Sequence, residues 1–157
     1  METTVETLGE RTFPNPAGYE HYTKENSIVS METAFNSIEE YLSKKDPIFL
    51  EQSGPMDKIF FDPSKVTAGI VTCGGLCPGI NDVIRAIYME LHFRYKVPKV
   101  LGFRYGYEGL VERFGHVPME FSHEYVTTIH QNGGSILSSS RGNQDPSEMV
   151  EYMQKLG

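Results

Sequence analysis

Three short stretches of the chain combine residue types that could bind a phosphate group. Residues 72–81 read TCGGLCPGIN and place three glycines, one proline and two cysteines within ten positions. Residues 138–143 read SSSRGN, and residues 102–110 read GFRYGYEGL. Free N–H groups at a helix start and the planar fork of an arginine both suit phosphate oxygens. These stretches could therefore form an anion site if the fold brings them together.

The glycine-rich stretch is open to three interpretations: a tight turn, a metal or redox site, and a phosphate cradle. Gly74 and Gly75 can adopt positive φ, and they lack the Cβ atoms that would keep a ligand from the backbone. The spacing matches neither G-x-G-x-x-G nor G-x4-G-K-[ST], so neither the dinucleotide fingerprint nor the Walker motif is present. The glycines alone are compatible with a turn and with a cradle.

Cys73 and Cys77 are the two cysteines of the chain. Their C-x3-C spacing differs from the C-x2-C of common zinc and thioredoxin-type sites, and no second pair completes such a site. No two histidines have the i,i+4 spacing of helical metal ligands. We predict two reduced thiols packed as small apolar groups, and no metal site.

The elements that must position these stretches alternate between strand and helix after Val66. The mostly apolar run VTAGIVT (66–72) is typical of a strand buried in a parallel sheet. A helix is expected to begin near Pro78, and KVLGFRYG (99–106) predicts the second strand. The expected apolar stripe of that helix consists of Ile80, Val83, Ile84, Ile87 and Leu91.

Two further elements follow the second strand. Residues 123–132 predict a short helix with Ser122 as N-cap, and a strand over YVTTI is the alternative, because Val and Thr favour sheets. SILSSS (135–140) predicts a third strand.

The last helix has a clear start, because Asp145 can cap it, Pro146 suits its first position and Glu148 completes a capping box. The order β-α-β-α-β-α predicts the α/β class, a partial doubly wound, Rossmann-like parallel sheet with right-handed crossovers. Residues 65–157 are expected to form the first, incomplete part of an α/β domain of the nucleotide-binding type.

In such a sheet, ligands bind at the carboxyl ends of the strands. Arg141 follows the third strand, so it is expected near Gly74 and Gly75, and this proximity favours the cradle over a solvated surface arginine. Tyr107 follows the second strand at the same edge. It could pack on a base or sugar, or it could be a half-buried loop tyrosine.

Residues 1–64 are expected to form an acidic extension and connector. They hold 12 Asp and Glu against 5 Lys and Arg, whereas residues 65–157 hold nine of each. Residues 1–26 predict an extended or poorly ordered arm, and residues 30–43 predict a helix capped by Ser30. The uneven acidic charge argues against nucleic acid, and no run of about 18 apolar residues predicts a membrane span. The first ten residues resemble neither a secretory signal nor a transit peptide, so a cytoplasmic location is expected.

The motifs resemble those of the phosphofructokinase family. GIVTCGGLCPGINDVIR resembles its first strand, G-G-x-x-P-G-x-N turn and first helix, and GYEGL resembles its second-strand loop. NGGSILSSSRG resembles the stretch that leads to its nucleotide-binding arginine. The resemblance covers roughly residues 54–157 in family order, and GPMDKIFFDP resembles the long-form branch of plants, protists and spirochaetes.

The resemblance implies the N-terminal part of a 6-phosphofructokinase. This glycolytic family moves a phosphoryl group from ATP, with Mg²⁺, to the 1-hydroxyl of fructose 6-phosphate. Gly74 and Gly75 would lie against the donor phosphates, which Arg141 and Gly142 would hold. Arg141 would also stabilise charge on the transferring group, and Tyr107 would line the nucleotide pocket. A pyrophosphate-dependent enzyme and a non-catalytic nucleotide-binding or regulatory fragment that pairs with full-length subunits are the alternatives.

Two family landmarks are absent from the 157 residues: the G-G-D-G-type loop, whose Asp holds Mg²⁺, and the T-I-D-N-D-type loop, whose Asp takes the proton from the sugar. The resemblance therefore places the catalytic Asp and the metal ligands beyond residue 157. It implies a homo-oligomer for the full-length enzyme and an inactive isolated fragment.

Overall fold

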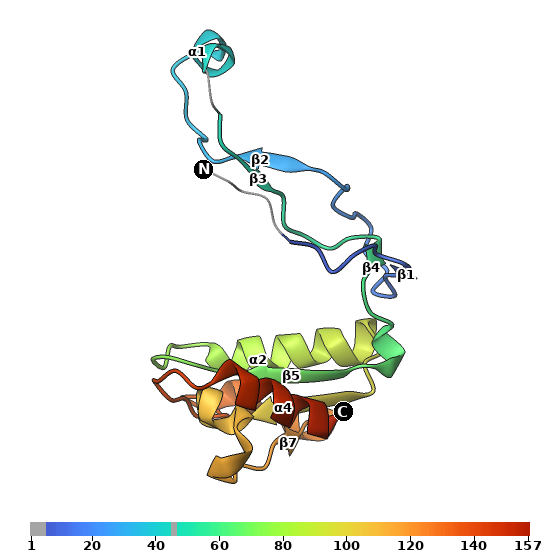
Figure 1. The fold of residues 1–157 in the computed structure, drawn as a ribbon, viewed down its shortest axis with the longest axis vertical. Coiled ribbons are helices and arrows are strands. Elements are labelled where there is room, and N and C mark those ends of the chain that lie inside the picture. The colour runs from blue at the N-terminus through green and yellow to red at the C-terminus, as the bar shows by residue number, and fades with distance from the viewer. Residues whose placement is uncertain (1–5, 45–46) are drawn as a thin grey trace. The chain divides into compact units, whose positions relative to one another are not determined.

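The chain divides into two compact units, Met1–Phe61 and Asp62–Gly157 (Figure 1). The computed structural model describes residues 6–44 and 47–157. Each unit has its own hydrogen-bonded strands, and each is described separately below.

The first unit consists mainly of extended backbone joined by two short antiparallel ribbons. In one ribbon β1 (Phe13–Pro14) pairs with β4 (Lys58–Ile59), and in the other β2 (Ile28–Ser30) pairs with β3 (Phe49–Glu51). A single buried apolar residue, Ala17, occurs among the described residues of this unit. The unit is therefore held by backbone pairing rather than by a hydrophobic core.

The helix expected over residues 30–43 is shorter than predicted. Helix α1 spans Ile38–Ser43, and Ser37 rather than Ser30 caps it by accepting a hydrogen bond from the Glu40 N–H at 3.1 Å. Ser30 ends β2 instead. The apolar side chains of Met31, Ile38 and Leu42 in this segment are exposed. Helical spacing produces a long helix only where a core covers its apolar face, and this unit supplies none.

The second unit is an α/β layer structure. Its sheet has the order β5-β6-β7, with β5 (Thr67–Val71) parallel to β6 (Lys99–Phe103) and Thr67 opposite Lys99. Strand β7 (Met119–Glu120) runs antiparallel to β6. The two parallel strands are those that the sequence predicts, and the α/β class is confirmed.

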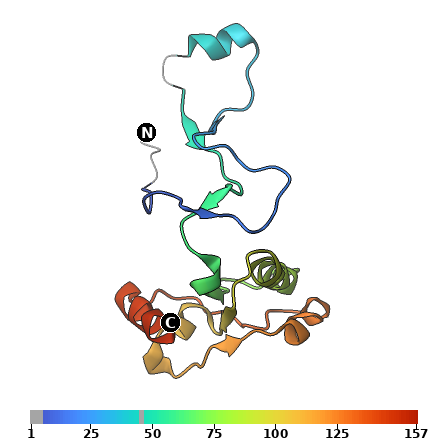
Figure 2. The same cartoon turned by 90° about the vertical axis from the view of Figure 1, so that its right-hand side faces the viewer.

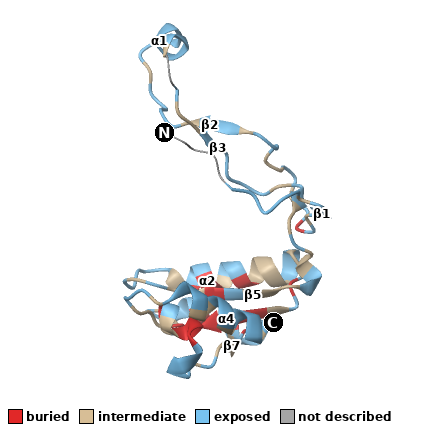
Figure 3. Cartoon of the chain, viewed as in Figure 1, coloured by how far each residue is buried: buried red, intermediate tan, exposed pale blue. Residues whose placement is uncertain are grey.

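Helices cover both faces of this sheet (Figure 2). Neighbouring residues of β6 point to opposite sides: Val100 belongs to the core cluster that contains Ile84 and Tyr88 of α2, whereas Leu101 packs in a second cluster with Met149. The helices are α2 (Ile80–Met89) with its π-helical continuation η2 (Glu90–Arg94), α3 (His123–Val126), η5 (Ile129–Gln131) and α4 (Pro146–Leu156). In Figure 3 the buried residues concentrate in this second unit, in its sheet and the helices beside it.

The buried face of α2 differs from the expected apolar stripe. Asn81, Ile84 and Tyr88 are buried, whereas Val83 and Ile87 of the stripe are exposed. Burial raises the pKa of the Tyr88 hydroxyl above its ordinary value. A polar residue thus takes a core position that the apolar pattern alone does not reveal.

The strand expected over residues 135–140 is wrong. This segment is a turn and an irregular loop, with Ser138 at a φ of 56°, and the position beside β6 is taken by β7. The described sheet is therefore mixed, rather than three parallel strands. Four of the six residues are serines. The Ser135 hydroxyl and the Ser138 and Ser140 carbonyls form hydrogen bonds with Thr72 or Gly74, so much of this segment is satisfied without a strand ladder.

Two helix starts are confirmed. Ser122 caps α3 by accepting from the Tyr125 N–H at 3.2 Å, which rules against the strand alternative over YVTTI. Asp145 caps α4 by accepting from the Ser147 N–H at 2.9 Å, with Pro146 at the first position. Glu148 lies 3.2 Å from Arg113, so it serves an ion pair in place of the expected capping box.

Candidate functional site

The glycine turn after β5 lies directly beside Arg141. Gly74 adopts a φ of 88°, which favours glycine, and its N–H donates to the Ser140 carbonyl at 3.3 Å. A Cβ placed on Gly75 would lie 3.5 Å from Nη2 of Arg141. The structure therefore brings together residues 72–81 and 138–143, as the sequence predicts. The second stretch follows a loop and not the expected strand.

The start of α2 adds backbone donors at the same turn. Gly79 occupies the N-cap position at a φ of 83°, and no side chain caps the helix there. The first N–H groups of a ten-residue helix thus remain available to an anion, and the helix dipole favours negative charge at this end. Asp82 lies in the first turn, where its carboxylate would repel an anion, whereas the guanidinium of Arg141 would attract one.

The end of β6 closes against the other two stretches. Gly106, at a φ of 59°, begins η3 (Gly106–Leu110). A Cβ at this position would lie 2.8 Å from the Ser140 hydroxyl oxygen and 3.3 Å from Sγ of Cys73. Gly106 is therefore required for close packing of the glycine turn, the β6 loop and the segment before Arg141.

Tyr107 lies at the edge of an open cavity of about 460 Å³. The cavity is lined by Tyr107, Asn143, Gln144, Pro146 and Met149. Tyr107 is 40% exposed, so part of its side chain is accessible from this cavity. Gly142 adopts a φ of 154°, and a Cβ there would meet nothing within 4 Å, so the backbone after Arg141 is open.

The cysteines depart from the prediction in one respect. Cys73 and Cys77 are free thiols, but both are exposed, so the expected packing as buried apolar groups is wrong. They flank the glycine turn, where the backbone is too open to enclose their side chains. Their exposure makes them useful reporters of ligand binding at this turn.

Two residues of the site escaped the sequence interpretation. Asn81 and Thr72 donate hydrogen bonds to backbone carbonyls of the segment that leads to Arg141. Asn81 shares a helical face with Ile84 and Tyr88, and this face differs from the apolar stripe expected from the sequence, so apolar spacing gave no signal for Asn81.

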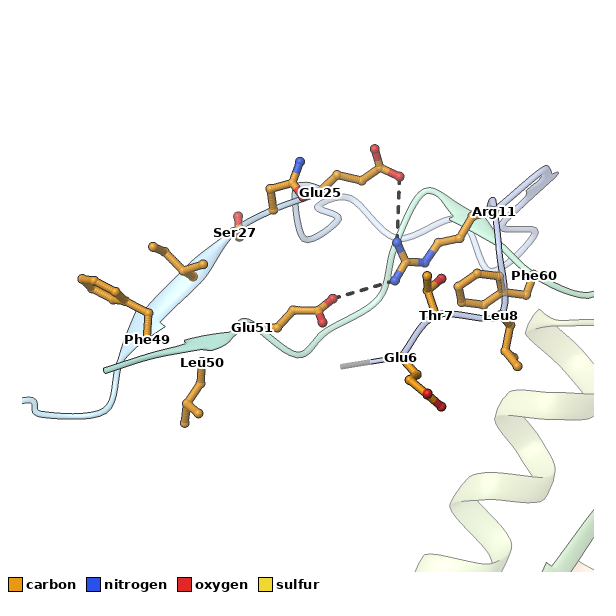
Figure 4. Close-up of a pocket in the computed structure, with 12 residues that line it drawn as sticks. Glu6, Thr7, Leu8, Arg11, Glu25, Ser27, Phe49, Leu50, Glu51 and Phe60 are labelled. Carbon is orange, nitrogen blue, oxygen red and sulfur yellow. Dashed lines mark ion pairs between the residues drawn. The ribbon is translucent and has the colours of Figure 1, made fainter. Parts of the chain in front are cut away.

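A separate cavity of about 850 Å³ lies within the first unit (Figure 4). Arg11 points into it, with guanidinium nitrogens 3.9 Å from Glu25 and 3.8 Å from Glu51, and it stacks over the Phe60 ring. The arginine is thus engaged by carboxylates of its own unit. None of the site residues that the sequence predicts lines this cavity.

Over residues 6–44 and 47–157, no three His, Cys, Asp or Glu side chains gather in a way that could hold a metal ion. Within the same ranges, no helix has the length and apolar content needed to cross a membrane.

Comparison with known families identifies the fold to which these elements belong. The phosphofructokinase family model matches residues 67–157, which include the glycine turn, Tyr107 and Arg141. The chain is similar to an ATP-dependent 6-phosphofructokinase of Trypanosoma cruzi, with 49% identity over 111 residues, 71% of this chain and 23% of that protein. It is also similar to an ATP-dependent 6-phosphofructokinase of Entamoeba histolytica, with 40% identity over 149 residues, 95% of this chain and 33% of that protein.

Among solved structures, a phosphofructokinase of Pichia pastoris in the T-state resembles the chain with a TM-score of 0.51 and 23% identity. The similarity covers 62% of this chain and 10% of that one, and it supports the fold alone. The chain spans about a quarter to a third of the length of the two curated relatives above.

Proposed function

Because the chain belongs to the phosphofructokinase family, we propose that it supplies the donor-phosphate-binding part of an ATP-dependent 6-phosphofructokinase. The reaction would transfer a phosphoryl group from ATP to the 1-hydroxyl of fructose 6-phosphate. The proposal includes a homo-oligomeric full-length enzyme in the cytoplasm. ATP is preferred over pyrophosphate because the curated relatives are named ATP-dependent.

One observation carries this proposal: the guanidinium of Arg141 lies over the open backbone of Gly75, 3.5 Å from where a Cβ would stand. A positive fork, two glycines without side chains and an uncapped helix start converge on one small region. That combination fits an anion with several oxygens, because each element supplies either a donor or unhindered access.

In this proposal, the residues of the chain bind and orient the donor. The N–H groups near Gly74 and Gly75 would contact its phosphate oxygens, and Gly142 would allow close approach on the other side. Arg141 would hold the terminal phosphate and offset the negative charge that is shared among its oxygens during transfer. Tyr107 would contact the base or sugar from its cavity.

The same proposal assigns no residue of this chain to proton abstraction or to the metal. Mg²⁺ would neutralise the donor phosphates when bound. The described residues offer it no cluster of ligands. We assign the catalytic Asp and the metal ligands to sequence beyond residue 157.

Titration calorimetry with ATP, and with tripolyphosphate as a probe that lacks the nucleoside, tests the donor site. Arg141→Ala should raise the dissociation constants of both ligands by about 10- to 100-fold, because a charge-assisted hydrogen bond contributes about 1.5–3 kcal/mol to binding. Arg11→Ala is the matched control, since Arg11 is paired with Glu25 and Glu51 in the other unit. Equal affinities of the wild-type chain and Arg141→Ala would contradict the proposed site.

A coupled assay for fructose 1,6-bisphosphate tests the assignment of catalysis. The purified 157-residue chain should give no product above the rate without protein, even at ATP concentrations that saturate the calorimetric site. Product that depends on Arg141 would place the missing catalytic groups within this chain.

A further inference from the structure

The segment that leads to Arg141 lacks the sheet ladder that usually fixes such a loop. Residues 132–140 make no strand pairing, and Gly134 has a φ of 73°. A glycine-rich, unpaired segment has many accessible conformations. Some other contacts must hold Arg141 at its place over Gly75.

A buried amide provides the first of these contacts. Asn81 is 2% exposed, and it is the one buried polar residue among the described residues. Its Nδ2 donates to the Asn132 carbonyl at 2.9 Å, and its Oδ1 accepts from the Ile136 N–H at 3.0 Å. One side-chain amide thus bridges both ends of a five-residue loop. Only one orientation of the amide satisfies a carbonyl and an N–H together, so the pairing is specific.

Three contacts continue the attachment toward Arg141. The Thr72 hydroxyl donates to the Ser138 carbonyl at 2.7 Å, and the Tyr105 N–H donates to the Leu137 carbonyl at 2.8 Å. The Gly74 N–H donates to the Ser140 carbonyl at 3.3 Å, one residue before Arg141. The segment is therefore fastened to the ends of β5 and β6 and to the start of α2.

We infer that Asn81 and Thr72 are positioning residues that hold Arg141 against the glycine turn. Asn81 fixes where the loop begins, and Thr72 fixes its path at Ser138. Without them the segment would keep its backbone bonds to Tyr105 and Gly74, but its path would be less fixed. Arg141 would then lie over Gly75 for a smaller fraction of the time. This inference rests on the proposed function for its consequence in donor binding, but not for its structural basis.

A double-mutant cycle in the full chain tests the inference through ATP affinity. Asn81→Ala should weaken ATP binding by about tenfold, a fraction of the loss expected when a binding group is displaced by about 1 Å. The same substitution in an Arg141→Ala background should cause no further loss, because its effect passes through Arg141. Equal losses in both backgrounds would show that Asn81 has only a general structural role and would overturn the inference.

Amide hydrogen exchange by NMR tests the same inference without a ligand. In Asn81→Ala, the N–H groups of Tyr105 and Gly74 should exchange at least about tenfold faster, because their acceptors lie in the released segment. The Phe121 N–H, which donates to the Val100 carbonyl at 2.9 Å within the sheet, should keep its exchange rate. Unchanged rates at Tyr105 and Gly74, or equal acceleration at Phe121, would overturn the inference.

A second variant guards against a failure of Asn81→Ala to fold. Thr72→Val keeps the side-chain shape and removes the hydroxyl bonds to Ser138 and Ser135 of the segment, so it should accelerate the same two amides. Thr127→Val is the matched control, because the Thr127 hydroxyl donates at the end of α3, to the His123 carbonyl at 2.6 Å, and not to the segment before Arg141. If the wild-type chain does not bind ATP, the proposed function fails, and the exchange rates alone decide whether Asn81 and Thr72 position Arg141.

Discussion

The two units of this chain have similar apolar patterns in their sequences, but only the second unit packs its apolar side chains into a core. Of the 14 buried apolar residues in the described ranges, 13 lie in Asp62–Gly157 and one, Ala17, lies in Met1–Phe61. The first unit exposes large side chains such as Ile28, Ile38 and Leu50. Helical and strand patterns thus become packed layers only where a sheet gives them a surface to cover.

The units also differ in how they use arginine. Arg11 of the first unit lies between two carboxylates, in a unit with 11 acidic and five basic residues. Arg141 of the second unit lies over glycine backbone, in a unit with ten acidic and nine basic residues. The carboxylates around an arginine neutralise its charge and occupy its donors, so it binds an anion weakly. An arginine beside glycine backbone has donors that an anion can reach. The difference lies in the neighbours of the arginine and not in its type.

The largest expected difference between the units is in stability. Ile84→Ala in α2 should lower the free energy of unfolding by about 2–5 kcal/mol, because it empties a site that is 1% exposed. Ile38→Ala in α1 makes the same change at a site that is 73% exposed, and its effect should stay within about 0.5 kcal/mol. Urea denaturation followed by far-ultraviolet circular dichroism measures both. Similar losses for the two variants would mean that Ile38 is covered in solution.

A smaller difference is expected between two glycines with almost the same backbone angle. Gly106 and Gly18 have φ values of 59° and 67°. Alanine at either position should lower the free energy of unfolding by about 1–2 kcal/mol, because the left-handed conformation is unfavourable for a residue with a Cβ. Gly106→Ala should lower the free energy of unfolding more than Gly18→Ala. Its Cβ would lie 2.8 Å from the Ser140 hydroxyl oxygen, whereas a Cβ on Gly18 would meet nothing within 4 Å. Equal melting temperatures of the two variants would show that Ser140 moves aside freely.

The sequence predicts what depends on neighbouring residues. Asp145 and Pro146 mark the start of α4 because capping and proline geometry act within one turn. The apolar runs of β5 and β6 predict the parallel pair for a similar reason. The family resemblance, now confirmed, rests on motifs of the same local kind.

The remaining features depend on partners that are distant in the sequence. Residues 135–140 have the composition of a strand, yet Asn81 and Thr72, more than 50 residues away, satisfy their backbone instead. Strand β7 has two residues, too few for a periodic signal. Helix α1 is shorter than predicted because no core covers its apolar face. The local spacing of apolar residues does not show whether such a core exists. The roles assigned to Gly74, Gly75, Tyr107, Arg141 and Gly142 stay predictions.

The smallest expected effect concerns thiol reactivity. Cys73 and Cys77 are exposed beside the proposed donor site, so bound ATP should shield them from iodoacetamide. At ATP concentrations ten times the dissociation constant, alkylation should slow by at most about tenfold, because about one site in eleven is free. A Ser53→Cys reporter in the first unit, followed by peptide mass spectrometry in the same sample, should react at one rate with and without ATP. Protection that persists in Arg141→Ala, or that extends equally to position 53, would place ATP elsewhere and remove the functional distinction between the two units.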